Sequence, residues 1–131
     1  MNTKLDKILA EISAGELIDK ITILEIKNQK IKDQEKLKEI NKELMSLNTT
    51  MNKLIPDVSK IEKFKSNLKE INLKLWDIED GKRAAEKDGD FGEKFINLAR
   101  NVYKFNDERA KIKLSINITL GSNIKEVKSY E

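Results

Sequence analysis

Apolar residues recur in alternating steps of three and four along most of this chain. Because an α-helix has about 3.6 residues per turn, this spacing places one apolar stripe along each helix, and such stripes pack at a shallow angle on neighbouring helices. The pattern predicts helices over residues 14–31, 35–54, 58–87 and 92–120. Three of the stripes consist of Leu37, Ile40, Leu44, Leu47, Met51 and Leu54; of Ile61, Phe64, Leu68, Ile71, Leu75 and Ile78; and of Phe91, Phe95, Leu98, Val102, Phe105, Ile112 and Ile116.

The first helix has a competing interpretation, because residues 21–26 are rich in β-branched side chains, which favour strands. A helix is preferred, because Ser13 and Glu16 form a capping box. In such a box the serine side chain bonds the backbone N–H of the third helical residue, and the glutamate reaches back to the serine. The residues before it predict a short amphipathic turn or helix, with one apolar side made of Leu5, Ile8, Leu9 and Ile12.

Breaks between the apolar stripes set the topology. Pro56 with Asp57 separates the second helix from the third, residues 88–92 form a glycine-containing loop, and Gly121 ends the last helix. Short connections imply antiparallel neighbours. We therefore predict one all-α domain over residues 1–131, with a short tail at residues 122–131. It is either an antiparallel four-helix bundle or a pair of long coiled-coil-like helical hairpins. If the four helices run alternately up and down, position 25 on the first helix lies at about the level of positions 43, 70 and 108 on the other three.

The residue types that are missing exclude several kinds of chemistry. The chain has no cysteine and no histidine, so it has no disulfide, no zinc–thiolate site, no iron–sulfur cluster and no Ser-His-Asp triad. The net charge is +3 with both signs interspersed, which argues against a nucleic-acid-binding face. Any catalysis would have to rely on carboxylates, lysine, arginine, tyrosine, hydroxyls and a hard cation such as Mg²⁺.

The sequence also bears on where the protein works. It contains no apolar run long enough to span a membrane, so membrane insertion is not expected. Residues 1–7 lack the apolar region and cleavage site of a signal peptide. The expected location is the cytoplasm.

Three arginines stand against 23 lysines, and all three lie within residues 83–109. A guanidinium offers carboxylates a planar pair of donors that an ammonium cannot match, so this part of the chain needs a specific charge geometry. Arg109 interrupts the apolar stripe of the last helix at about the level of Glu25. A Glu25–Arg109 pair inside the bundle is therefore expected, serving either a ligand or the register of the helices.

A second charged group surrounds Trp76. Asp80 and its neighbour Glu79 lie three and four residues before Arg83, the spacing at which side chains meet on a helix. Arg100, across the 88–92 loop, could reach the same carboxylates. This group is either a ligand-binding pocket walled by the tryptophan or a salt-bridge network between two helices. The candidate ligand-binding residues are Glu25, Trp76, Asp77, Asp80, Arg83, Arg100 and Arg109.

Two acidic pairs suggest an enzymatic alternative. Glu16 with Asp19, and Asp77 with Asp80, each place two carboxylates on one helix face. Paired acidic helices bind Mg²⁺ in helical-bundle pyrophosphohydrolases, so a magnesium-dependent nucleotide or nucleotide-sugar pyrophosphohydrolase is the alternative function. The expected helix levels argue against it, because they separate the two pairs by roughly 20 Å.

Six sequence blocks resemble an uncharacterised family of small helical bacterial proteins, some encoded among surface-polysaccharide and glycosyltransferase genes. The blocks are residues 15–27, 75–80, 89–91, 98–103, 106–109 and 126–130. The resemblance implies no known activity, but it does imply a role beside glycan assembly, with a protein partner there. Relatives in that family often have an extended segment before the first block.

Taken together, these patterns favour a small non-enzymatic binding or assembly protein without a cofactor. Mg²⁺ is expected only under the alternative. Some helices carry a second apolar side, which one bundle cannot bury entirely, and exposed apolar patches tend to be interfaces. We therefore predict a homodimer. The residues behind this expectation are Ile23, Ile26, Leu73 and Ile96.

Overall fold

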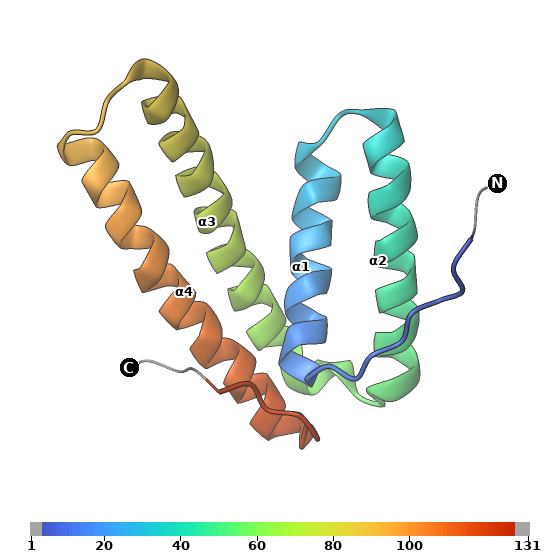
Figure 1. Ribbon diagram of the computed structural model, residues 1–131. Coiled ribbons are helices and arrows are strands. Elements are labelled where there is room, and N and C mark those ends of the chain that lie inside the picture. Colours follow the sequence, from blue (N-terminus) through green and yellow to red (C-terminus); the bar gives the residue numbers. More distant parts are fainter. Residues whose placement is uncertain (1–3, 128–131) are drawn as a thin grey trace.

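The structure, a computed structural model, describes residues 4–127 and shows four α-helices and one short 3-10 helix within them (Figure 1). The prediction of four helices is confirmed, and helix rather than strand over residues 21–26 is confirmed as well. None of the described helices is long and apolar enough to cross a membrane. The elements are α1 (Ala14–Lys30), α2 (Gln34–Leu54), η1 (Val58–Ile61), α3 (Glu62–Asp88) and α4 (Glu93–Leu120).

The helix ends follow from local chemistry. The Ser13 hydroxyl accepts a hydrogen bond from the Glu16 N–H at 3.0 Å, as the capping box predicts, and Asp33 caps α2 in the same way. The Glu16 carboxylate does not complete the box, because it pairs with Lys113 instead. Gly89 and Gly121, with φ of 69° and 63°, end α3 and α4 in the left-handed conformation that glycine adopts most easily.

Helix α1 is the central element. It packs against α2, α3 and α4, whereas α2 packs mainly on α1. The chain therefore forms two helical hairpins, α1–α2 and α3–α4, which join through α1 and whose looped ends diverge (Figure 1). Of the two predicted architectures, paired hairpins describe this arrangement better than a closed bundle.

The main core lies where the start of α1 meets the ends of α2 and α4 and the start of α3. Every helix contributes to it, and α1 contributes most. Such burial on several sides is typical of a central helix rather than of a surface helix. The core residues are Leu17, Ile18, Ile21, Met51, Ile55, Ile61, Leu68 and Ile116.

Residues 4–12, called the N-terminal segment below, are not helical. The predicted amphipathic turn or helix is therefore wrong for the isolated chain. Leu5, Ile8 and Leu9 are 76%, 81% and 88% exposed, so no described part of the molecule covers them. A helix of this length is unstable in water without such packing, which explains the non-helical conformation.

The tail is partly described and docks on the start of α1. The Ser122 hydroxyl accepts the Ala14 N–H at 3.0 Å, and Ser13 donates to Glu126 at 2.9 Å. Asn123 donates to Glu11 at 2.7 Å. Residues 128–131 of the predicted tail lie outside the described residues.

Candidate functional site

The most buried charged group is the Asp19 carboxylate, whose residue is 0% exposed. Arg109 binds it with two donors: Nε lies 2.9 Å from Oδ1, and Nη2 donates to Oδ2. Asn72 donates to Oδ1 at 2.9 Å and also to Thr22 Oγ1 at 3.0 Å. A buried carboxylate is costly unless it is paired and hydrogen-bonded, and here these donors meet both conditions.

This pair joins α1 to α4 and keeps Arg109 charged. Hydrogen bonding to Asp19 raises the pKa of Arg109 above its ordinary value, although partial burial opposes the charge. The two parallel bonds require a guanidinium, because an ammonium cannot bond both carboxylate oxygens in this planar geometry.

A second bridge lies beside the first. Lys113 Nζ is 2.6 Å from a Glu16 oxygen and 3.2 Å from a Glu126 oxygen. Burial lowers the pKa of Lys113, but the hydrogen bond and charge of Glu16, together with Asp19 and Glu126, outweigh this effect and raise that pKa overall. Lys113 therefore holds α1, α4 and the tail together.

The close approach of α1 and α4 depends on Gly15. A Cβ at this position would lie 2.4 Å from the Lys113 carbonyl oxygen, so the backbones leave no room for a side chain. The Gly15 N–H donates to Asn117 Oδ1 at 2.6 Å. Since Ser13 and Ser122 take the neighbouring N–H groups, the start of α1 is capped by the chain itself.

The predicted Glu25–Arg109 pair is wrong. Arg109 binds Asp19, more than one helical turn nearer to the start of α1, and the assumed helix levels account for the error. Glu25 instead lies 3.5 Å from both Lys65 and Lys69 on α3. Arg109 thus forms an ion pair, as expected, but its partner is Asp19, which the sequence had placed in the acidic pair Glu16–Asp19.

The group around Trp76 does not assemble into one cluster. Trp76 is half-buried, while Asp77, Asp80, Arg83 and Arg100 are exposed. Glu79 pairs with Lys82 at 3.6 Å, and within residues 4–127 no ion pair links Arg83 or Arg100 to these carboxylates. A ligand-binding role for the seven candidate residues stays a prediction, but the structure does not bring them together.

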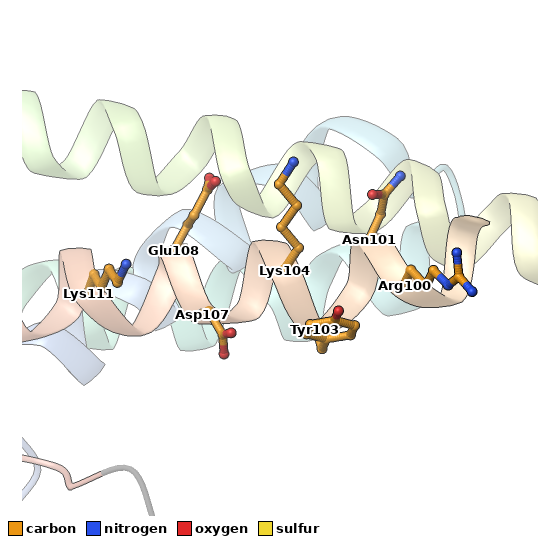
Figure 2. A pocket seen from close by; sticks show the side chains of 7 residues that line it. All are labelled: Arg100, Asn101, Tyr103, Lys104, Asp107, Glu108 and Lys111. Carbon is orange, nitrogen blue, oxygen red and sulfur yellow. The ribbon is translucent and has the colours of Figure 1, made fainter. Parts of the chain in front are cut away.

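Arg100 lies instead at an open depression of about 320 Å³ on α4. In Figure 2, Asn101, Lys104 and Glu108 project toward α3, whereas Tyr103 and Asp107 project from the opposite side of α4. The depression is a surface feature of one helix and carries both signs of charge. Its lining residues are Arg100, Asn101, Tyr103, Lys104, Asp107, Glu108 and Lys111.

A family of unknown function (DUF6165) matches residues 8–131. The chain belongs to this family. No curated protein and no solved structure matches the chain. The family assignment confirms the resemblance to small helical proteins of unknown function and assigns no activity to this DUF6165 chain.

The surface of the chain includes a second apolar stripe on α4, which we call the outer stripe. Its members follow one another in steps of three and four around Asp107, on the side of α4 away from the packed stripe. Exposure is 45% for Ile96, 65% for Tyr103, 43% for Leu114 and 64% for Ile118. The outer stripe consists of Ile96, Ala99, Tyr103, Ala110, Leu114 and Ile118.

Sequence reasoning found only one member of the outer stripe. Ile96 is exposed as expected, but Ile26 is buried, because α1 is central, and Ile23 and Leu73 are half-buried. The signal for the other members was present in the sequence: α4 shows the helical spacing of apolar residues on two sides. A helix with two apolar sides needs a partner on each.

Proposed function

We propose that the protein is a non-enzymatic helical assembly module that forms a homodimer through the outer stripe of α4. The observation that carries this proposal is the exposure of Ile96, Tyr103, Leu114 and Ile118 along one line of a single helix. Exposed apolar residues that stand alone are common, but several along one face of a helix, here interrupted only at Asp107, are typical of an interface.

The charges beside the outer stripe favour a second copy as the partner. Arg100, Asp107 and Lys111 follow one another along the same helix, with a negative charge between two positive ones. A surface of one sign would repel its own copy, whereas a mixed surface can face itself with opposite charges opposed. The stripe runs for about 33 Å along α4, enough for a helix-to-helix contact.

The charged groups between α1 and α4 are paired within the molecule, which supports a structural role for them. Asp19 on α1 binds Arg109 on α4, and Glu16 on α1 binds Lys113 on α4. No buried side-chain polar atom in the described part of the chain lacks a hydrogen-bond partner. The magnesium-dependent alternative requires converging carboxylates. Among residues 4–127, no three acidic side chains form a group that could hold a metal ion.

The resemblance adds a setting to this proposal: a cytoplasmic module that holds a protein partner in surface-glycan assembly. This setting stays a prediction. A nucleotide sugar or divalent cation that bound the native protein would raise its melting temperature. We expect neither to do so, because the proposed surface is apolar, and a reproducible shift would favour the pyrophosphohydrolase alternative.

Light scattering after size-exclusion chromatography tests the dimer. The unmodified protein is expected at about twice 15.1 kDa, and Ile118→Glu at 15.1 kDa, because a carboxylate cannot be buried in an apolar contact without large cost. Met45→Glu is the matched control, since Met45 is 71% exposed on α2. An unchanged dimer in the Ile118→Glu variant would contradict the proposal.

A further inference from the structure

The N-terminal segment has a pattern that its conformation does not use. Leu5, Ile8, Leu9 and Ile12 follow the spacing of one face of an amphipathic helix, and lysine, alanine and glutamate between them favour helix. In the isolated chain the segment is nevertheless non-helical and exposes these side chains. A conflict between local pattern and local structure often marks a segment that folds on binding.

Within the part of the chain that the structure describes, the segment does not pack on an apolar surface. Ser13 caps α1 directly, so no linker separates the segment from α1. From the base of α1 the segment leads past α2, away from α4 (Figure 1). In this conformation residues 4–12 therefore do not cover the outer stripe of their own α4 (Figure 1), although that stripe is the matching exposed apolar surface.

We propose that the N-terminal segment of each copy folds into an amphipathic helix on the outer stripe of the second copy, at Ala110, Leu114 and Ile118. This inference rests on the proposed homodimer and names the segment that covers its interface. The contact follows the helix-in-groove mode of recognition, in which residues at helical spacing anchor a short peptide.

The dimensions and charges of the two surfaces fit. Leu5 to Ile12 spans about 10 Å as a helix, and Ala110 to Ile118 spans about 12 Å. Asp6 gives the segment a carboxylate that can oppose Lys111, the exposed lysine of the docking site. Reciprocal exchange between two copies covers both segments and the Ala110–Ile118 part of both outer stripes, which closes the assembly as a symmetric dimer.

Cross-linking can locate this contact, because the chain has no cysteine. Leu9→Cys and Ile118→Cys are made as separate proteins, mixed, and treated with a short bismaleimide. Any cross-link between the two different chains is then intermolecular. Met45→Cys, on exposed α2, replaces Ile118→Cys in the control mixture. We expect a Leu9→Cys with Ile118→Cys product and no product above background in the control.

The outcomes separate this inference from the proposed function. If Ile118→Cys cross-links to itself and the mixture gives no cross-link between the two different chains, α4 packs on α4. The proposed dimer would then stand, and the exchange of segments would be overturned. No product from either, with a 15.1 kDa mass, would overturn both. Leu9→Glu should also weaken dimerisation by about tenfold or more, because it removes a buried apolar anchor. An unchanged dissociation constant would overturn the exchange.

Discussion

The buried carboxylate of Asp19 explains why position 109 is an arginine in a chain that otherwise favours lysine. Arg109 satisfies both carboxylate oxygens at once, and Asn72 completes their hydrogen bonding. Arg100, by contrast, is exposed and lines an open depression. The rarity of arginine indicated that charge geometry matters in this region, but burial distinguishes the structural arginine from the exposed one.

Replacing each arginine by lysine should therefore give different results. Arg109→Lys keeps the charge but leaves one Asp19 oxygen under-bonded, at a cost of about 1–3 kcal/mol in the free energy of unfolding. Arg100→Lys is the matched control, and its unfolding free energy should change by less than about 0.5 kcal/mol. Urea denaturation midpoints measure both. Equal midpoints for the two variants would refute the role assigned to the guanidinium of Arg109.

Lys113 predicts a pH dependence at the alkaline end. Because its pKa is raised in the folded state, its contribution to stability is fully present below the ordinary lysine value of 10.5 and is lost as the pH rises through the higher folded value. Lys113→Met should flatten the fall in melting temperature above that pH. Lys104→Met, an exposed lysine on the same helix, is the control. If both variants kept the slope of the unmodified protein, Lys113 would not be its source.

Among the elements, the contact between α1 and α4 is set by backbone approach at Gly15. Gly15→Ala places a methyl group against the Lys113 carbonyl and should lower the unfolding free energy by about 1–3 kcal/mol through overpacking. Gly81→Ala, inside α3, meets only a flexible Leu98 methyl at 3.2 Å and should be neutral or slightly stabilising. Thermal unfolding of the two variants checks this, and a stable Gly15→Ala protein would contradict the close packing.

Helices could be predicted from the sequence, because apolar spacing and caps are local. The start of α1 at residue 14 follows from Ser13, and the end of α3 from Gly89. The partner of Arg109 could not be predicted, because it depends on how far one helix slides along another. Chain order gives that register only to about a turn, whereas Gly15 sets it through a backbone contact that no local pattern reveals.

The N-terminal segment shows the opposite limit. Its pattern predicts a helix, but Leu5, Ile8 and Leu9 pack on no apolar surface of the described chain, and so the local preference is not realised. The central position of α1, by contrast, is indicated by its sequence. Its residues Ile18, Ile21 and Ile26 are apolar on several sides of the helix and become fully buried.

The whole molecule is two hairpins that share a core at one end and diverge at the other (Figure 1). This shape leaves the outer side of α4 and the N-terminal segment as apolar surfaces without a partner among residues 4–127. Self-association of the protein follows from these exposed apolar surfaces. Both surfaces belong to one chain, and the segment matches the Ala110–Ile118 part of the stripe in length.

Sedimentation equilibrium of the unmodified protein over increasing concentration tests this claim most directly. The weight-average mass should rise from near 15.1 kDa toward about twice that value within the micromolar range and then level off, as a closed dimer requires. A mass that stays at 15.1 kDa throughout the range would contradict the claim, and so would a mass that continues to climb past the dimer.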